Sequence, residues 1–249
     1  MGNMMALASY QFRLFRRDFL TLFFALAFPV LMFIIFSNLF GSQEATGGVA
    51  IQQYLVPSYI PIIIINTLFM SFGLLMVTYK EHGYFLKYKV MGLNPIQVAI
   101  SIFLAVIILQ LFGIGLLAVM AVITKGITIP FGNMVNVTLT IVLINLFEFA
   151  IAFFLSALFL KARTYQALAL ILFYFQMFLG GLTFPPEMFG NVLRSVMEII
   201  NPVIYGLYMM RGVWVEGASF ISYGKEILIL TAISVVFIAA GTKLFRWNG

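Results

Sequence analysis

The side chains that most often do chemistry in proteins are scarce in this sequence. There is no Cys, and His82 is the single His among 249 residues. Disulfides, thiolate metal ligands and His-based metal sites are therefore excluded. The H-E-x-x-H and G-x-S-x-G motifs of hydrolases are absent, and so is the G-x-x-x-x-G-K-[ST] loop that cradles nucleotide phosphates. The sequence gives no support for catalysis or for nucleotide binding by that loop.

One acidic residue, Glu148, lies deep inside a long apolar run, where a charge costs about 2.5 to 3.5 kcal/mol. Asn145 shares its helical face, and no Lys or Arg lies at a similar depth. We expect Glu148 to be protonated or hydrogen-bonded, with Gln110, Gln176 or Asn66 as its partner. Two interpretations stay open: a polar contact for a cationic or amphipathic substrate, or a polar contact between helices.

Residues 180–214 interrupt the apolar sequence with two pieces that are too short to cross a bilayer. A Gly-Gly and Pro-Pro start leads to about a dozen residues, and Asn201-Pro202 separates these from about eight more that end at Arg211. Half-length helices persist at membrane depth only where they are buried in protein or line a wet cavity. The pattern predicts a re-entrant helical hairpin over residues 185–214.

Residues 80–95, KEHGYFLKYKVMGLNP, connect two apolar runs and have a helical pattern of their own. Phe85 and Tyr88 are interleaved with Lys87, and the stretch ends at an Asn-Pro pair. The pattern predicts a short helix that is both basic and aromatic. Such a helix is either an inert connector held at the membrane surface or a contact for a partner protein.

The elements that position these residues follow from composition. The chain is 63% hydrophobic and 9% charged, with a mean hydropathy of +1.10, whereas about a quarter of the residues of a soluble domain are charged. Long apolar runs, rather than short alternating segments, predict an all-α membrane protein, as a single domain over residues 1–249. The six predicted transmembrane helices are 19–40, 54–79, 96–123, 134–160, 165–184 and 222–245.

Residues 1–18 precede the first of these spans and predict an amphipathic helix on the membrane surface. Three basic residues, Arg13, Arg16 and Arg17, fall on its polar side. Its apolar side is predicted to consist of Met5, Ala8, Phe12, Phe15 and Phe19.

Positive charge orients the predicted spans. Six spans place both ends of the chain on one side, and ten of the 14 Lys and Arg residues lie on that side. The positive-inside rule makes it cytoplasmic, in a multi-pass protein of the cytoplasmic membrane. The net charge of +6 is then explained by topology, so we expect membrane lipid and no nucleic acid as a partner. The four basic residues on the opposite side are Lys125, Arg194, Arg211 and Lys225.

Together these features resemble the permease subunits of ABC-2 type transporters. The resemblance covers nearly the whole chain: the N-terminal helix, the Lys80-Glu81-His82-Gly83 start of the loop between spans two and three, and the hairpin before span six. It implies the type V exporter fold. Its most specific part is the order Gly181, Phe184-Pro185, Asn201-Pro202, Tyr205 and Arg211.

The resemblance also implies partners. Two six-span chains, identical or related, form the transport path, and two copies of a separate ATPase subunit bind ATP and Mg²⁺, so this chain binds no cofactor itself. Residues 80–95 would be a coupling helix in a cleft of the ATPase, beside the N-terminal helix. The implied coupling residues are Lys80, Glu81, His82, Gly83, Phe85, Lys87, Tyr88, Arg13, Arg16 and Arg17. The implied outer gate consists of Phe184, Pro185, Glu187, Asn201, Pro202, Tyr205 and Arg211.

We therefore expect the permease subunit of an ATP-driven exporter of amphipathic or lipophilic molecules, such as drugs or antimicrobial or cytolytic peptides. Aromatic residues along 165–184, among them Phe173 and Tyr174, suit such a cargo, although contact with lipid explains them equally. Export of polysaccharide or lipid-linked glycan is the nearest alternative, and an ATP-independent channel or a membrane enzyme is an alternative of another class. The candidate path residues are Glu148, Asn145, Gln110, Gln176 and Phe178.

Overall fold

The computed structural model describes residues 2–40, 51–93, 95–184, 186 and 189–245. Within these ranges the chain is helical and contains no strand, which confirms the all-α prediction. The N-terminal half consists of α1 (Gly2–Arg17), α2 (Phe19–Leu22), the π-helix η1 (Phe23–Ala27), α3 (Phe28–Phe40), α4 (Ile51–Asn66), the π-helix η2 (Thr67–Gly73), α5 (Leu74–Glu81), α6 (Tyr84–Val90) and α7 (Pro95–Lys125). The C-terminal half consists of the 3-10 turn η3 (Phe131–Asn133), α8 (Met134–Leu158), α9 (Ala162–Leu179), α10 (Asn191–Ile200), α11 (Val203–Val215), the 3-10 turn η5 (Phe220–Tyr223) and α12 (Gly224–Leu244).

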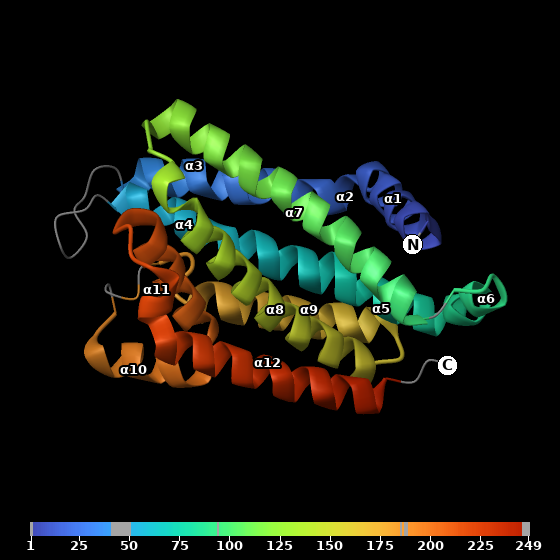
Figure 1. Ribbon diagram of the computed structural model, residues 1–249. Coiled ribbons are helices and arrows are strands. Elements are labelled where there is room, and N and C mark those ends of the chain that lie inside the picture. Colours follow the sequence, from blue (N-terminus) through green and yellow to red (C-terminus); the bar gives the residue numbers. More distant parts are fainter. Residues whose placement is uncertain (1, 41–50, 94, 185, 187–188, 246–249) are drawn as a thin grey trace.

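The second long segment, α4–η2–α5, is the centre of the bundle. Its most apolar window is 83% buried, against 17% for that of α12, which lies on the outside. In Figure 1 this segment (teal) runs through the middle, with α3 and α7 on one side and α12 on the other. Its Val and Ile side chains are buried because neighbouring helices, rather than lipid, surround them.

Five helices of the described chain are long and apolar enough to cross a membrane: Phe23–Phe40, Gln53–Glu81, Ile96–Lys125, Phe131–Leu158 and Phe220–Leu244. They correspond to five of the six predicted spans. The remaining predicted span corresponds to α9, which has 18 residues and so a length of about 27 Å, close to the thickness of a hydrocarbon core. Arg163, Gln166 and Gln176 make α9 less apolar than the others, and its crossing of the membrane stays a prediction.

The beginning of α1, the end of α12 and the whole of α6 lie at one end of the bundle (Figure 1). The opposite end carries α10 and α11. The common position of the two termini agrees with an even number of passes through the bundle.

α1 packs along α7, so much of its apolar side faces protein. Ala8 and Phe15 are buried, and the ring of Phe12 stacks on that of Phe112, 6.1 Å away, so these residues contact protein rather than the predicted membrane surface. Met5, and Phe19 at the start of α2, are 66% and 75% exposed, and their contact with the membrane stays a prediction.

The residues of the predicted hairpin form two short helices, α10 and α11, separated by Asn201 and Pro202, and their re-entrant position in the membrane stays a prediction. α11 packs against α4 and α8, and most of its side chains are buried. It continues to Val215, beyond the predicted end at Arg211, and the chain turns at Gly217, whose φ of 66° is left-handed. α10 lies outside it, with Val192 82% exposed.

Candidate functional site

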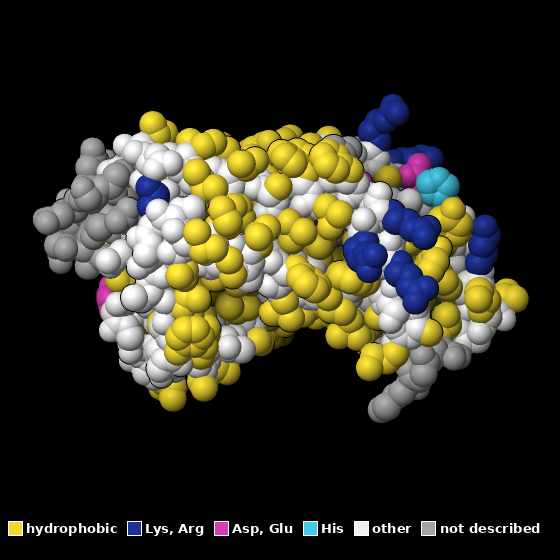
Figure 2. Space-filling view, turned by 90° about the horizontal axis from the view of Figure 1, so that it is seen from above, with side chains coloured by type: hydrophobic (Ala, Val, Ile, Leu, Met, Phe, Trp, Pro, Cys, Tyr) yellow, Lys and Arg dark blue, Asp and Glu magenta, His cyan; other side chains and the backbone are white. Residues whose placement is uncertain are grey.

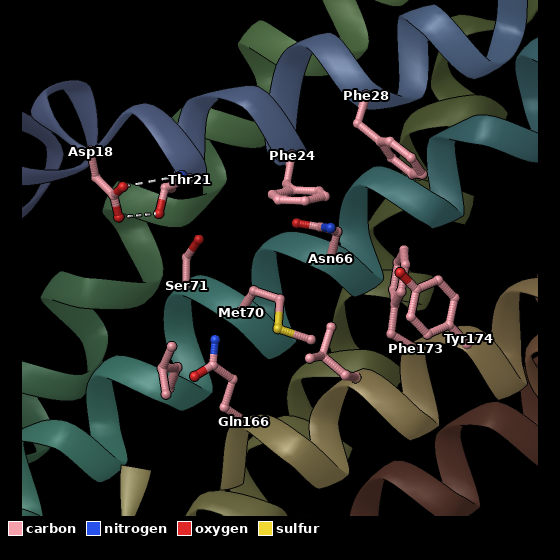
Figure 3. Close-up of a pocket in the computed structure, with 12 residues that line it drawn as sticks. Asp18, Thr21, Phe24, Phe28, Asn66, Met70, Ser71, Gln166, Phe173 and Tyr174 are labelled. Carbon is pink, nitrogen blue, oxygen red and sulfur yellow. Dashed lines mark hydrogen bonds between the residues drawn. The ribbon is translucent and has the colours of Figure 1, made fainter. Parts of the chain in front are cut away.

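A cavity of about 450 Å³ lies between three long segments of the bundle. Residues of α2, η1 and α3 form one wall, residues of α4, η2 and α5 form the second, and α9 forms the third (Figure 3). Cavities that bind small organic ligands typically have volumes of about 300 to 1,000 Å³. This cavity is therefore the candidate ligand site.

The cavity lining is polar at one end and aromatic at the other (Figure 3). Its polar end is formed by Asp18, Thr21, Ser71 and Gln166. Its aromatic part is formed by Phe24, Phe28, Phe173 and Tyr174, with Asn66 and Met70 between the two ends. Such a lining suits a ligand with an apolar body and one polar head.

Asp18 is the one charged side chain among the described lining residues. One carboxylate oxygen accepts a hydrogen bond from the Thr21 backbone N–H (3.3 Å) and the other from the Thr21 hydroxyl (2.6 Å). These bonds cap the start of α2 and orient the carboxylate. The same group places a negative charge at the polar end of the cavity.

The first wall includes a π-helix, which Pro29 helps to explain. Pro29 has no N–H to donate to the carbonyl of Ala25, and the Phe28 N–H instead bonds to the carbonyl of Phe23, five residues back. Gly113 of α7 approaches the Ala25 carbonyl so closely that a Cβ there would lie 2.8 Å from its oxygen. Pro29 is the sequence signal that could have indicated this irregular wall.

The second wall is also π-helical. In η2 the Leu74 N–H bonds to the Phe69 carbonyl, and the Tyr165 hydroxyl of α9 donates to the same carbonyl (3.0 Å). The Tyr165 hydroxyl occupies the space that a Cβ on Gly73 would need. Gly73 therefore lets α9 approach the central segment and close the cavity.

The five predicted path residues are absent from the lining of this cavity. Gln110, one expected partner of Glu148, instead donates to the Thr67 hydroxyl (2.9 Å). Phe178 stacks on Phe184, 6.3 Å away. Of the aromatic residues that the sequence associated with either cargo or lipid, Phe173 and Tyr174 do line the cavity.

Glu148, Asn145 and Gln176 are buried in the bundle, with 0%, 5% and 6% of their surface exposed. The Gln176 side chain of α9 lies against the Glu148 carboxylate of α8. The structure thus brings these three predicted residues together, outside the cavity.

At the α6 end, Lys80 and Glu81 bind the ends of two other helices. The Lys80 ammonium donates to the carbonyls of Ser156 (2.6 Å) and Ala157 (3.3 Å), in the last turn of α8. Glu81 accepts a bond from the Ala162 N–H at the start of α9 (2.7 Å). A cation at a helix C-terminus and an anion at an N-terminus both complement the helix dipoles. The two residues therefore tie the start of the 80–95 loop to the α8–α9 connection.

α6 itself covers seven residues and lies between Gly83 and Gly92, which have positive φ angles of 67° and 76°. Phe85, a predicted coupling residue, is only 2% exposed and packs against the rings of Tyr79 and Phe245. It anchors α6 to the bundle.

The outer surface of α6 is apolar and basic. Leu86, Val90 and Met91 are 48%, 90% and 69% exposed. Among the predicted coupling residues, Lys87 is also exposed and lies over the ring of Tyr84, 4.8 Å away. Tyr88 is half-buried against Tyr79, and the Nδ1–H of the exposed His82 donates to the Thr78 carbonyl (2.9 Å). Leu86 and Met91 were not predicted as contacts, because neither residue type is distinctive in so apolar a sequence.

α1 is joined to the base of this loop by a buried pair. The Gln11 amide nitrogen and the Tyr79 hydroxyl are 2.7 Å apart, and the hydroxyl lies 3.0 Å from the amide oxygen. Arg13, Arg16 and Arg17 remain exposed, in agreement with their predicted polar side. Figure 2 shows basic side chains gathered at this end of the molecule, next to the His side chain, and hydrophobic side chains over its middle.

Three residues of the implied outer gate bind other helices. The buried Asn201 amide donates to the Phe175 carbonyl of α9 (3.2 Å), and the Phe184 ring packs edge-on against Phe36 (5.7 Å). Arg211 is 6% exposed and donates to the Ser58 hydroxyl of α4 (3.1 Å). Half-buried Tyr205 lies beneath the Lys225 ammonium (5.7 Å), and Pro202 opens α11. Pro185 and Glu187 lie outside the described residues.

The two hairpin helices are joined by a small polar cluster. Arg194 and Glu198 of α10 form an ion pair (3.3 Å), and Tyr208 of α11 accepts from Arg194 (3.2 Å) and donates to Glu198 (2.9 Å). Burial raises the pKa of Tyr208 to about 12. The hydrogen bond between Arg194 and the Tyr208 hydroxyl raises the pKa of Arg194. The hydroxyl therefore stays protonated and the guanidinium charged at neutral pH.

The comparisons with known proteins agree with this architecture. A search of curated proteins finds no match. The family model described as ABC-2 type transporter matches residues 3–215, from the start of α1 to the end of α11. The match includes the cavity, the α6 end and the hairpin, so the chain belongs to the ABC-2 type transporter family, as a multi-pass transmembrane subunit that works with an ATPase subunit.

Proposed function

We propose that this chain is the permease subunit of an exporter that moves cationic amphipathic molecules outward across the cytoplasmic membrane. The observation that carries the proposal is the cavity, with a carboxylate at one end and four aromatic rings along the rest. An amphipathic cation places its charge at Asp18 and its apolar body between Phe24, Phe28 and Phe173. Drugs and short cytolytic peptides have this chemistry.

The volume of the cavity favours such cargo over the glycan alternative. About 450 Å³ holds a drug-sized molecule, whereas a growing polysaccharide needs a channel that is open along its length. An independent channel is disfavoured because membership of the family brings an ATPase subunit.

The position of the polar end of the cavity supports the proposed outward direction of transport. Asp18 precedes α2, and Gln166 lies in the first turns of α9, so both are close to the basic end that carries α6. With that end in the cytoplasm, a substrate meets the polar head site first and the aromatic part next. The side chains of Leu170 and Tyr174 are partly exposed at the edge of the cavity, and a second permease chain is proposed to close this side.

The energy of ATP hydrolysis is proposed to reach this chain through a contact between the ATPase subunit and α6. Its exposed Leu86, Val90 and Met91 give an apolar contact for an ATPase cleft, and Lys87 gives charge. The bonds of Lys80 and Glu81 to α8 and α9 would carry a displacement of α6 to the α9 wall of the cavity. Two ATPase subunits would serve two permease chains in this arrangement.

The test compares wild type with Asp18→Asn, after reconstitution in liposomes with the ATPase subunit. Asn keeps one oxygen that accepts from the Thr21 N–H, and its amide nitrogen can donate to the Thr21 hydroxyl oxygen, but it has no charge. For a fluorescent monocationic amphiphile, ATP-driven transport at limiting concentration should fall about fivefold, equivalent to about 1 kcal/mol. Transport of an uncharged analogue of the same size should not change. Glu216→Gln, at an exposed residue beyond α11, is the matched control.

Equal losses for the charged and uncharged substrates would mean that Asp18 only caps α2, and the cationic preference would be wrong. An absence of ATP-dependent movement for both compounds would contradict the exporter assignment itself.

A further inference from the structure

The middle of α8 contains a buried carboxylate, that of Glu148. Glu148 is 0% exposed, and both of its carboxylate oxygens lack a hydrogen-bond partner among the described residues. The residue lies about 15 Å along the helix from Leu158, far from either end of α8. A buried charge without a partner is among the costliest features a fold can hold.

Two further oxygens in the same neighbourhood also lack a donor. Asn145 lies three residues before Glu148 on the same face of α8, and its amide nitrogen donates to the Ile141 carbonyl (3.1 Å), which leaves its oxygen unpaired. The oxygen of Gln176, whose side chain lies against Glu148, is unpaired as well. Four acceptor oxygens therefore lack a donor among the described residues, and leaving buried polar groups unpaired is unfavourable.

No basic side chain of the described chain forms a salt bridge with Glu148. Lys80 binds carbonyls at the end of α8, and Arg211 binds Ser58 of α4. The titratable and charged side chains on the elements packed against α8 are Tyr54 and Tyr59 of α4, Tyr79, Lys80 and Glu81 of α5, Arg163, Tyr165 and Tyr174 of α9, Tyr205, Tyr208 and Arg211 of α11, Tyr223 of η5, and Lys225, Glu226 and Lys243 of α12.

We propose that Glu148 is a proton-binding site, at which one proton converts the carboxylate into a neutral acid that donates to the Gln176 amide oxygen. One O–H bond forms at Glu148, and the proton comes from water and returns to water, so no other reactant is needed. The added proton removes the buried charge and supplies one donor, which pairs with the Gln176 oxygen. The resulting hydrogen bond joins α8 to α9.

The ligand is a proton and not a metal ion. Hard divalent cations such as Ca²⁺ take about six to eight oxygen ligands, and this neighbourhood offers four unpaired ones from three side chains. The described residues also contain no group of three His, Cys, Asp or Glu side chains that could hold a metal. A proton needs neither extra ligands nor extra space.

The site is linked to the cavity through α9. Phe173 lies three residues before Gln176 and lines the cavity, so a movement of α9 displaces both. A conformation in which α9 moves away from α8 would separate Gln176 from Glu148 and remove the acceptor for this proton. Protonation therefore favours the conformation described here over one in which α9 has moved.

Infrared spectroscopy of the full chain in lipid nanodiscs tests the site directly and does not depend on transport. At neutral pH, wild type should show the carbonyl stretch of one buried carboxylic acid, which Glu148→Gln lacks and the exposed-residue control Glu216→Gln retains. Gln176→Leu, which removes the acceptor, should move the band to higher frequency. Spectra of wild type and Glu148→Gln that do not differ in this region would overturn the proposal, and a band that Gln176→Leu leaves unmoved would overturn the assigned acceptor.

Thermal unfolding of the same samples gives a second readout. The wild-type midpoint should fall as pH rises, because unfolding releases Glu148 to ionise in water, while the midpoint of Glu148→Gln should depend less on pH. An equal pH dependence in the two proteins would contradict the proposal. If Na⁺ raises the unfolding midpoint and the carboxylic acid band is absent, the ligand of Glu148 is a metal ion rather than a proton.

Discussion

Lys80 and Glu81 are adjacent in the sequence and of opposite charge, yet they do not pair with each other. Each binds backbone at the end of a different helix, Lys80 at the end of α8 and Glu81 at the start of α9. Because those two ends are separated by three residues, adjacent side chains can reach both. These two charges resemble a solvated surface pair in the sequence, but buried Lys80 and exposed Glu81 each bind the end of another helix.

At this scale we predict that Lys80→Met weakens the fold. Met keeps an unbranched apolar stem but removes the hydrogen bonds to the carbonyls of Ser156 and Ala157, with an expected loss of about 1–3 kcal/mol in the free energy of unfolding. Denaturant unfolding in mixed micelles measures the loss. Lys89→Met, at an exposed position of α6, is the control and should leave stability unchanged. Identical stability of the Lys80 variant and wild type would show that the two bonds contribute nothing.

α6, the proposed contact for the ATPase subunit, depends on the rest of the bundle for its stability. A helix of seven residues is not stable alone, since isolated helices need about 12–15 residues even in favourable sequences. The burial of Phe85 between Tyr79 and Phe245 holds it in place. A Phe85→Ala change would therefore detach α6 as well as remove a side chain, which makes the exposed residues better probes of a partner contact.

We predict that the double variant Leu86→Asp, Val90→Asp loses the ATPase subunit. Two carboxylates in an apolar contact should weaken binding at least tenfold, or by about 1.4 kcal/mol, without changing the stability of the permease, because both side chains are exposed. Co-purification of the tagged chain with its ATPase measures the effect. Val192→Asp, 82% exposed on α10 at the opposite end, is the matched control. A double variant that retains the ATPase would place the contact elsewhere.

In the whole molecule, the central segment α4–η2–α5 connects the two ends of the bundle. It begins near α11, lines the cavity as η2, and ends at Lys80 and Glu81, which bind the ends of α8 and α9. A displacement at α6 has a continuous packed route to the cavity.

The orientation of this molecule is predicted to place α6 in the cytoplasm and Glu216 outside. The chain has no Cys of its own, so Lys89→Cys and Glu216→Cys can be labelled singly, and both positions are exposed. A membrane-impermeant maleimide added to intact cells should label Glu216→Cys, and Lys89→Cys should react only after permeabilisation. The opposite pattern would invert the topology and, with it, the proposed direction of transport.

The sequence by itself determined the helices, the membrane environment and the family. Long apolar runs can bury their backbone polar groups in lipid only as helices, so hydropathy specifies these features locally. The break at Asn201-Pro202 was readable because it separates two short apolar pieces and Pro202 has no N–H to continue the first helix. Pro57 and Pro61, by contrast, lie inside α4, so Pro alone does not end a helix in this protein.

Only the tertiary structure decided where the cavity lies and which partner each polar side chain has. Asp18, Ser71 and Gln166 are far apart in the sequence and meet because three helices pack together. Gln110 pairs with Thr67, while Gln176 lies against Glu148. In a bundle of uniformly apolar helices, hydropathy does not select one neighbour over another. The choice is made by close approaches such as that of Gly73 to Tyr165 and by the irregular turns of η1 and η2, which depend on the packed whole.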